Sequence, residues 1–349
     1  MDALWDSPDF DEHELVQFVT DRESGLRALI AVHSTHLGPG AGGVRFWHYA
    51  QTGDAVADVL RLSRGMSYKN AMAGLPMGGG KGVILAGEDR VKTPELIAAF
   101  GRAVDSLGGR YVTAQDVGMS EADMIALSQV TRYVSGLPPK NGGAGGDPGP
   151  STAQGVFLGV KAAIRHRLGA DSAKDVRIAI QGVGSVGGGL ARRLAAEGAR
   201  LTIADVNADR ANTLAKEIGA TAVHADEIMT VDADVFSPNA LGAILNKESI
   251  GKLKAGIVAG GANNQLATRA DGNRVLERGI LYAPDYVINA GGIINVALEY
   301  LGQGDRSEVN NRIEQIPARL TGIWQESERT GIPASDVADA MAKKLIGRG

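Results

Sequence analysis

Two lysines that flank a run of glycines could serve acid–base chemistry. Lys69 lies in a helical pattern, and Lys81 opens an apolar, strand-like run directly after three consecutive glycines. If both amines shared one desolvated site, each positive charge would disfavour the other and burial would act in the same direction, so one lysine could be a base near neutral pH. The alternative is that both lysines lie on the surface and that the glycines only serve a turn.

The segment LPMGGGKG around Lys81 does not fit a nucleoside triphosphate site. A phosphate-binding loop of that class reads G-x-x-x-x-G-K-[ST], but here Leu75 stands in place of the first glycine and Gly82 in place of the hydroxyl residue. We expect the glycines to let a substrate or a water molecule approach Lys81 without steric hindrance.

A second glycine-rich segment predicts a dinucleotide site. The sequence GVGSVG follows an apolar strand and opens a helical pattern, as the G-x-G-x-x-G fingerprint requires. Such glycines permit a tight turn, let a pyrophosphate approach the backbone amides, and allow the helix to pack closely on the strand. The residues expected to surround the pyrophosphate are Gly182, Gly184, Ser185, Val186 and Gly187.

Asp205 supports the dinucleotide interpretation. It ends the next strand, near the distance of about 20 residues at which an acid binds the adenosine ribose. Its carboxylate would repel a 2′-phosphate, so the cofactor expected is NAD rather than NADP. The alternative is a turn that merely needs glycine, with Asp205 as a solvated strand end.

Composition excludes several classes of function. The chain has 349 residues and a formal net charge of −4, so it is long enough for two domains and has no basic excess for nucleic acid or anionic membranes. It has no cysteine, which excludes disulfides, thiolate metal sites and a cysteine nucleophile, and no metal is expected. The acidic start lacks the features of a signal peptide, so we expect a cytoplasmic protein with a small-molecule partner.

The pattern of elements predicts two α/β domains. Strand-like runs (LVQFV, LRALIAVHS, GVILAG and YVTAQDV) alternate with helical patterns before the proline- and glycine-rich segment 138–151, the best candidate for a linker. The alternation after it predicts a parallel, doubly wound Rossmann sheet. We therefore assign residues 1–140 to the first domain and 141–329 to the second. The amphipathic segment 330–349 could fold back and complete the first domain.

Six further segments resemble one enzyme family. The segments MSYKNAMAGLPMGGGKGVIL, AQDVGMSEADM, GDPGPSTAQGV, SPNALGAIL, GGANNQL and YAPDYVINAGGIINV are similar, in this order, to the Glu/Leu/Phe/Val dehydrogenase family, and in detail to its leucine-specific members. The resemblance implies that the first domain, with a mixed sheet, binds an amino acid and that the second binds NAD(P), with chemistry in the cleft between them. It also implies a homo-oligomer.

The resemblance assigns roles to individual residues. It implies that Lys69 holds the substrate carboxylate together with Asn263, that Lys81 activates water, and that Asp116 shuttles a proton of the amino group. Asp116 could instead cap the helix that begins near Ser120, and Asn263 could only satisfy loop backbone. The positions expected near the nicotinamide and its ribose are Thr152, Asn239, Ala240 and Asn263.

The expected side-chain pocket favours branched-chain substrates. Ala41 stands where glutamate-specific members carry a lysine, so a buried γ-carboxylate would lack a partner. Ala114 and Val296 resemble the leucine type, whereas Ala41 is smaller than the leucine common there and would widen the pocket. The full set of pocket residues implied is Ala41, Gly42, Ala114, Ile293 and Val296. Leu298 replaces a common acid, for which we have no functional explanation.

The sequence thus predicts the reversible, NAD-dependent oxidative deamination of an apolar L-amino acid to the 2-oxo acid and ammonia. Leucine, valine and isoleucine are favoured, but a difference of one or two methylenes is worth only about 1–3 kcal/mol, so overlapping use is expected. A phenylalanine dehydrogenase is the alternative among enzymes. A non-catalytic NAD-binding sensor is the alternative of another class.

Overall fold

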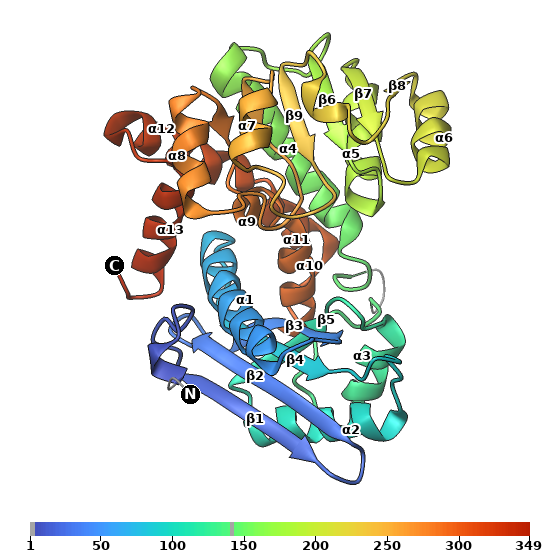
Figure 1. Ribbon diagram of the computed structural model, residues 1–349, viewed down its shortest axis with the longest axis vertical. Coiled ribbons are helices and arrows are strands. Elements are labelled where there is room, and N and C mark those ends of the chain that lie inside the picture. Colours follow the sequence, from blue (N-terminus) through green and yellow to red (C-terminus); the bar gives the residue numbers. More distant parts are fainter. Residues whose placement is uncertain (1–3, 140–142) are drawn as a thin grey trace. The chain divides into compact units, whose positions relative to one another are not determined.

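The chain divides into two units (Figure 1). The computed structural model describes residues 4–139 and 143–349. Unit 1 comprises Met1–Gly146, Ile293–Val309 and Ala342–Gly349; unit 2 comprises Asp147–Gly292 and Asn310–Met341. The predicted boundary at 140/141 falls outside the described residues. The other predicted boundary, at 329/330, lies inside a helix, and residues 293–309 were not expected in the first unit.

Unit 1 is built on a mixed sheet, as predicted. Its strands are β1 (Leu15–Asp21), β2 (Leu26–Ser34), β3 (Gly40–Trp47), β4 (Gly78–Leu85) and β5 (Tyr111–Gln115). They lie in the order β1-β2-β4-β3-β5; β1 is antiparallel to β2, and β2 to β4, whereas β3 runs parallel to both β4 and β5. The sequence did not predict β3, because its first half reads GAGG and glycine is disfavoured in strands.

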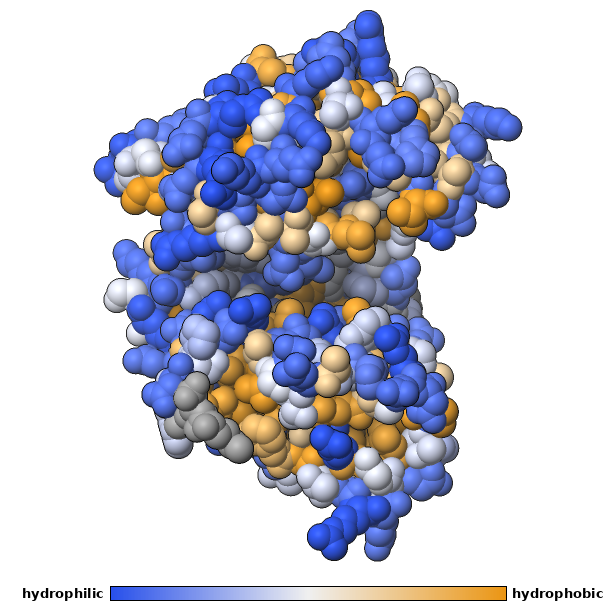
Figure 2. Space-filling model, in the orientation of Figure 1, coloured by the Kyte–Doolittle hydropathy of each residue, from blue (hydrophilic) through white to orange (hydrophobic). Residues whose placement is uncertain are grey.

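Strand β1 is one edge of this sheet in the described part of the chain. Its Phe18 is 62% exposed, which is unusual for a large aromatic side chain. On the face drawn in Figure 2, apolar residues gather over the part of unit 1 that holds the sheet, whereas the surface of unit 2 is mainly hydrophilic with scattered apolar residues. Unit 1 therefore carries apolar surface that its own fold does not bury.

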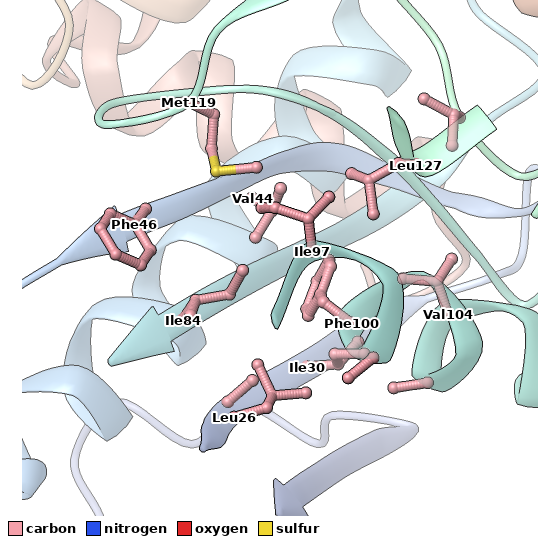
Figure 3. Packing of buried hydrophobic residues seen from close by; sticks show 14 of the residues in the cluster. Leu26, Ile30, Val44, Phe46, Ile84, Ile97, Phe100, Val104, Met119 and Leu127 are labelled. Carbon is pink, nitrogen blue, oxygen red and sulfur yellow. The ribbon is translucent and has the colours of Figure 1, made fainter. Parts of the chain in front are cut away.

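Helices cover both faces of the sheet of unit 1. They are α1 (Thr52–Met72), α2 (Pro94–Ser106) and α3 (Glu121–Ser128). Along β2 the side chains alternate: Leu29 and Ala31 pack toward α1, while Ile30 and Val32 belong to the larger cluster formed with α2 and α3, shown in Figure 3. On β4, Val83 faces α1, so Lys81, two residues earlier, stands on the α1 side as well.

Capping residues fix where the helices of unit 1 begin. Thr93 accepts a hydrogen bond from the amide of Leu96 and precedes Pro94, the first residue of α2. Ser120 and Asp123 form a reciprocal capping box at the start of α3. Because Ser120 is the N-cap of α3, Asp116 is not needed there, and the alternative that Asp116 caps this helix is wrong.

The last part of the chain contributes helices to both units. These helices are α10 (Gly291–Tyr300), α11 (Arg306–Ile313), α12 (Ile316–Thr330) and α13 (Ala334–Leu345). Within unit 1, the side chain of Asn295 on α10 exchanges two hydrogen bonds with the backbone of Gly145, and Glu299 accepts one from the amide of Gly136. These bonds fix α10 to the segment that follows β5.

Unit 2 contains a parallel six-stranded sheet. Its strands are β6 (Arg177–Gln181), β7 (Arg200–Ala204), β8 (Thr221–Ala222), β9 (Val235–Pro238), β10 (Ile257–Val258) and β11 (Leu281–Tyr282). Its helices, besides α12, are α4 (Gly149–Leu168), α5 (Ser185–Ala196), α6 (Ala208–Ile218), α7 (Lys247–Lys252), α8 (Arg269–Glu277) and α9 (Asp285–Ile288). The order β11-β10-β9-β6-β7-β8 reverses at β6, as in a Rossmann fold, so the loop after β6 lies at the switch point where such sheets bind dinucleotides.

None of the helices in residues 4–139 and 143–349 combines the length and the apolar character that a membrane span requires.

Candidate active site

The sheet of unit 1 brings Lys81 and Asp116 into direct contact. The Lys81 Nζ donates a hydrogen bond to Asp116 Oδ2 at 2.6 Å. Lys81 projects from β4, and Asp116 directly follows β5, two strands away in the sheet. The Lys81 side chain is only 7% exposed and that of Asp116 is 23% exposed, so the pair is well shielded from water.

Burial changes the acid–base properties of this pair. It lowers the pKa of the Lys81 amine; the negative charge of Asp116 opposes that shift, and the positive charge of Arg45 adds to it. Burial alone would raise the pKa of Asp116, but the charge and hydrogen bond of Lys81, together with the charge of Arg45 and the amide of Val117, outweigh it and hold that pKa below its ordinary value. Lys81 therefore gives up its proton more readily than an exposed lysine, beside a carboxylate that stays ionised.

Arg45 and Asp58 extend the pair into a chain of charges. The Arg45 Nε donates to Asp116 Oδ2 at 3.2 Å, and its NH1 group donates to Asp58 Oδ2 at 2.7 Å. The Tyr49 hydroxyl donates to the same Asp58 oxygen at 2.5 Å. Sequence reasoning assigned no role to these three residues. Arg45 stands in the GGVR segment beside the pocket positions, but its pairing with two carboxylates far apart in sequence had no local signal.

The glycines before Lys81 do not serve the role expected of them. They lie in β4 rather than in a turn, and the space in front of Gly79 is filled: a Cβ there would overlap the backbone nitrogen and the hydroxyl of Ser67 on α1. A Cβ on Gly80 would meet the ring of Tyr111 at 2.6 Å. The absence of side chains therefore lets α1 and β5 pack closely around the strand that carries Lys81, rather than leaving room for a substrate.

Lys69 lies on the last turn of α1 and is half-buried. The neighbouring Asn70 is buried, and its side-chain amide donates to the carbonyls of Gly78 at 2.6 Å and Ala41 at 3.4 Å. This amide ties the end of α1 to β3 and β4. The charged groups that shift the pKa of Lys81 most are Asp116, Arg45 and Asp58, so the expectation that Lys69 drives this shift is not supported.

The five predicted pocket positions all fall in unit 1. Ala41 and Ala114 are buried on the neighbouring strands β3 and β5. Val296 is buried on α10, where a Cβ on Gly136 would lie 3.7 Å from its Cγ1. Ile293 on α10 is half-buried and Gly42 is buried on β3, where a Cβ would overlap the carbonyl of Gly80. Leu298 is fully buried, which gives it a packing role.

The glycine loop of unit 2 has the geometry of a dinucleotide fingerprint. Gly182 has φ +83°, a left-handed conformation that a tight turn requires. Gly184 is the N-cap of α5 and has no atom within 4 Å of its Cβ position, whereas a Cβ on Gly187 would overlap the carbonyl of Gly182. The first glycine thus permits the turn, the second leaves open space at the helix N-terminus, and the third permits close packing. These residues fit a bound pyrophosphate.

Asp205 is held against this loop. Its Oδ2 accepts a hydrogen bond from the amide of Val183 at 2.8 Å, and its Oδ1 accepts one from the amide of Asn207 at 2.9 Å. Its side chain is 5% exposed, and Arg210 lies 3.6 Å from the carboxylate. Asp205 is therefore not a solvated strand end. Its carboxylate has a fixed position beside the glycine loop.

Other predicted cofactor residues lie on adjoining loops of unit 2. Asn239, directly after β9, is held by three contacts: its amide donates to the carbonyl of Gln181 at the end of β6, its Nδ2 donates to Ser237 on β9, and its Oδ1 accepts from the amide of Gly261 at 2.9 Å. A Cβ on Gly182 would meet the Ala240 methyl at 2.8 Å, so Ala240 borders the glycine turn.

Thr152 and Asn263 make different contacts. Thr152, in the first turn of α4, donates from its hydroxyl to the carbonyl of Pro148 at 2.9 Å. Asn263 is exposed, and its Oδ1 accepts a hydrogen bond from Asn289 at 2.7 Å. This bond joins two side chains, so the alternative in which the Asn263 side chain only satisfies loop backbone does not describe it.

Comparison with known proteins shows which family the chain resembles. Residues 13–133 match the model of the Glu/Leu/Phe/Val dehydrogenase dimerisation domain, and residues 202–345 match that of the Glutamate/Leucine/Phenylalanine/Valine dehydrogenase domain. The leucine dehydrogenase of Thermoactinomyces intermedius is 46% identical over 335 residues, covering 96% of this chain and 91% of that protein. The valine dehydrogenase of Streptomyces virginiae is 46% identical over 337 residues, covering 96% and 94%.

A solved structure agrees with these relatives. The L-tryptophan dehydrogenase of Nostoc punctiforme matches with a TM-score of 0.85 at 40% identity, covering 96% of each chain. With both family models matched and relatives similar over nearly the whole length, the chain belongs to the Glu/Leu/Phe/Val dehydrogenase family.

Proposed function

We propose that this chain catalyses the NAD-dependent oxidative deamination of an apolar L-amino acid, with leucine, isoleucine and valine favoured. The observation that carries the proposal is the buried contact between Lys81 and Asp116. A lysine with a lowered pKa beside an ionised carboxylate supplies the two proton carriers that the reaction needs. In the balanced reaction, the amino acid, NAD⁺ and water give the 2-oxo acid, ammonium, NADH and a proton.

The residues of unit 1 divide the proton transfers between them. Lys69 holds the substrate carboxylate, and Asp116 takes a proton from the substrate amino group. NAD⁺, when bound by the glycine loop of unit 2, would supply the acceptor for the hydride from Cα, and the oxidised substrate would be an iminium. Lys81 then removes a proton from the water that attacks the iminium carbon, and Asp116 returns a proton to the departing amine. Lys81 can act as this base because burial lowers its pKa.

The cofactor proposed is NAD rather than NADP. The open space at Gly184 and the N-terminus of α5 support a pyrophosphate there. Asp205 supports the choice of NAD, because its fixed carboxylate can accept hydrogen bonds from ribose hydroxyls and would repel a 2′-phosphate. Asn239, Ala240, Thr152 and Asn263 are proposed to border the nicotinamide and its ribose.

The proposed preference for branched-chain substrates is supported by small, apolar pocket positions. Ala41 and Ala114 are buried and uncharged, so the side-chain carboxylate of a glutamate substrate beside them would lose its hydration without gaining a charged partner. Relatives of similar identity are named for leucine and for valine. The solved relative named for tryptophan makes aromatic substrates the second candidate. A non-catalytic sensor is disfavoured, because a binding protein has no need of a buried amine beside an ionised carboxylate.

We also propose that the chain forms a homo-oligomer through unit 1. The family model that matches residues 13–133 is described as a dimerisation domain. The exposed Phe18 on the edge strand β1 and the apolar surface of unit 1 support this assignment. The cytoplasmic location expected from the sequence stays a prediction.

The test is NADH formation with leucine, isoleucine, valine, phenylalanine, tryptophan and glutamate offered separately, for the natural chain and for Lys81→Ala. We expect kcat/KM to be highest for the branched-chain substrates and lowest for glutamate. Lys81→Ala should lose turnover by a factor of about 100 to 10,000, as expected for a lost general base, while still binding NADH.

Each result has a distinct meaning. A higher kcat/KM with phenylalanine or tryptophan would move the substrate class to aromatic amino acids and leave the reaction unchanged. Ordinary turnover by Lys81→Ala would remove Lys81 from the mechanism. No turnover with any amino acid by the natural chain, despite NADH binding, would favour the sensor.

A further inference from the structure

Arg45 is the charged group nearest to the catalytic pair that the proposed reaction does not use. Its Nε and the Nζ of Lys81 converge on one atom, Asp116 Oδ2, at 3.2 Å and 2.6 Å. The Arg45 side chain is 24% exposed, so water screens this contact only in part. Two cations thus share one carboxylate oxygen, an arrangement that affects how firmly either cation is held.

A second carboxylate fixes Arg45 in this position. The NH1 group of Arg45 donates to Asp58 Oδ2 at 2.7 Å, and the Tyr49 hydroxyl donates to that same oxygen at 2.5 Å. Arg45 lies on β3 and Asp58 on α1, so the ion pair also connects the helix to the sheet. The guanidinium spans the two carboxylates with two different nitrogens, which a single ammonium group could not reproduce.

We propose that Arg45 is a positioning residue: it shares Asp116 with Lys81, keeps that carboxylate ionised and oriented, and prevents it from retaining the proton on Lys81, while Asp58 moderates this effect. The inference rests on the proposed function, because it assigns Arg45 a role through Lys81 and Asp116. Neither Arg45 nor Asp58 is assigned contact with the substrate.

The charges predict opposite effects for two substitutions. Arg45→Gln removes a cation and leaves the carboxylates of Asp116 and Asp58 facing Lys81, so the pKa of Lys81 should rise. Asp58→Asn removes an anion and leaves Arg45 to act on Asp116 alone, so the pKa of Lys81 should fall. Both directions follow from the signs with which Arg45 and Asp58 act on the amine.

Other titratable groups also lie on the elements around β4. They are Lys69 on α1, Tyr111 on β5, Tyr49 after β3, and His33 on β2. The Tyr111 hydroxyl donates to the carbonyl of Gly42 at 2.8 Å, and His33 contacts Ser67, Asp11 and Arg348. All four are unchanged in the variants, so differences between the variants report on Arg45 and Asp58.

The experiment is the pH dependence of kcat/KM for leucine, measured on the full chain and on Arg45→Gln, Arg45→Lys and Asp58→Asn. The acidic limb should move upward by about one pH unit in Arg45→Gln, since a nearby charge shifts a pKa by about 1–3 units, and downward in Asp58→Asn. Arg45→Lys should keep the limb near its natural position, because the charge remains, while kcat falls because the two-carboxylate bridge is lost.

Arg61→Gln is the matched control. Arg61 lies one turn after Asp58 on α1 and is 63% exposed; its ion pair is with Asp9, and the charge of Asp58 acts on it less strongly. It loses the same charge as Arg45→Gln, and its acidic limb should stay in place. The proposal would be overturned if the acidic limbs of Arg45→Gln and Arg61→Gln lay at the same pH. It would also be overturned if the limbs of Arg45→Gln and Asp58→Asn shifted in the same direction.

Lys81→Ala separates this inference from the proposed function. If Lys81→Ala keeps ordinary turnover, the proposed base is wrong, and the role of Arg45 is wrong with it. If Lys81→Ala loses turnover while Arg45→Gln keeps the natural acidic limb, only the inference about Arg45 fails. Should Arg45→Gln not fold, the directions found for Arg45→Lys and Asp58→Asn decide the question.

Discussion

Asp205 is the single residue on which the proposed choice of cofactor depends. Asp205→Ala should lower the ratio of kcat/KM for NAD⁺ to that for NADP⁺ by about tenfold or more. The reason is that the 2′-phosphate no longer meets a negative charge, while Arg210, which lies 3.6 Å from the carboxylate, is left to attract it. The measurement is the initial rate as a function of the concentration of each cofactor, at saturating amino acid.

Asp205→Asn separates charge from loop support, because an amide oxygen can still accept the hydrogen bond from Val183. Asp209→Ala, at an exposed acid in the first turn of α6, is the control. If the cofactor ratio of Asp205→Ala equals that of the control, another residue distinguishes the ribose from its phosphate.

At the residue scale, the sequence predicted the site residues that belong to a motif. It missed the site residues whose role arises only when elements distant in the sequence meet. Lys81 and Asp116 stand in segments typical of the family, and the structure joins them at 2.6 Å. Arg45 and Asp58 have no comparable pattern, because their roles depend on a strand and a helix that meet only after folding. The glycines before Lys81 were misinterpreted for the same reason: α1 fills the space in front of Gly79, and Tyr111 on β5 fills the space in front of Gly80.

At the scale of elements, β4 and α1 form the support of the proposed site. Gly79→Ala should lower the free energy of unfolding by about 1–3 kcal/mol or more. A Cβ there would overlap the backbone of Ser67 and the carbonyl of Ser63, which cannot move without shifting the helix. Because α1 also carries Lys69 and Asp58, the same shift should reduce kcat/KM. Urea unfolding, with the activity of the folded fraction, measures both effects.

Gly65→Ala provides a control on the same helix. Gly65 lies within α1 and has no atom within 4 Å of its Cβ position, so an alanine there should stabilise the helix by about 1 kcal/mol. If the free energy of unfolding falls in Gly79→Ala and rises in Gly65→Ala, the loss at Gly79 comes from packing. If Gly79→Ala unfolds at the same urea concentration as the natural chain, the packing of α1 against β4 does not require a glycine at this position.

The elements also show where sequence patterns stop being informative. The helical patterns DAVADVLRLSRGMSYKNAMAG and PELIAAFGRAVDSLG predict α1 and α2 nearly to their ends, because helix periodicity is a local signal. The strand β3 was missed because its glycines conceal an alternating pattern. The position of α10 in unit 1 was missed too, since it depends on hydrogen bonds that Asn295 and Glu299 accept from backbone amides 150 and 163 positions earlier.

At the scale of the whole chain, unit 1 is assembled from three separate segments, and the last of these segments is hydrogen-bonded to the first. Arg348, next to the last residue, donates to the carbonyls of Asp11, Glu12 and His33. Its NH1 group also donates to His33 Nε2 at 2.8 Å. Arg348 can only donate to His33 Nε2, whereas Asp11 Oδ2, at 3.3 Å from the same nitrogen, can only accept. The contact with Arg348 is the shorter of the two and favours neutral His33, with the proton on Nδ1, which lies 2.8 Å from Ser67 Oγ.

The stability of unit 1 should therefore fall in mild acid. Burial and the positive charge of Arg348 lower the pKa of His33 to about 3, from an ordinary value near 6.5. Between these values the unfolded chain binds a proton that the folded chain does not, so stability is present above about pH 6.5 and is lost as pH falls toward 3. The loss amounts to at most about 1.4 kcal/mol per pH unit for one histidine. The midpoint of urea unfolding at pH 7, 6 and 5 measures it.

His33→Gln removes the titration while an amide oxygen can still accept from Arg348, so its midpoint should depend less on pH than that of the natural chain. The buried His13 also has a lowered pKa, chiefly through burial, so part of the dependence should remain. His224→Gln, at an exposed side chain, is the control. An equally steep dependence in His33→Gln and in the natural chain would mean that unit 1 admits the proton without releasing Arg348.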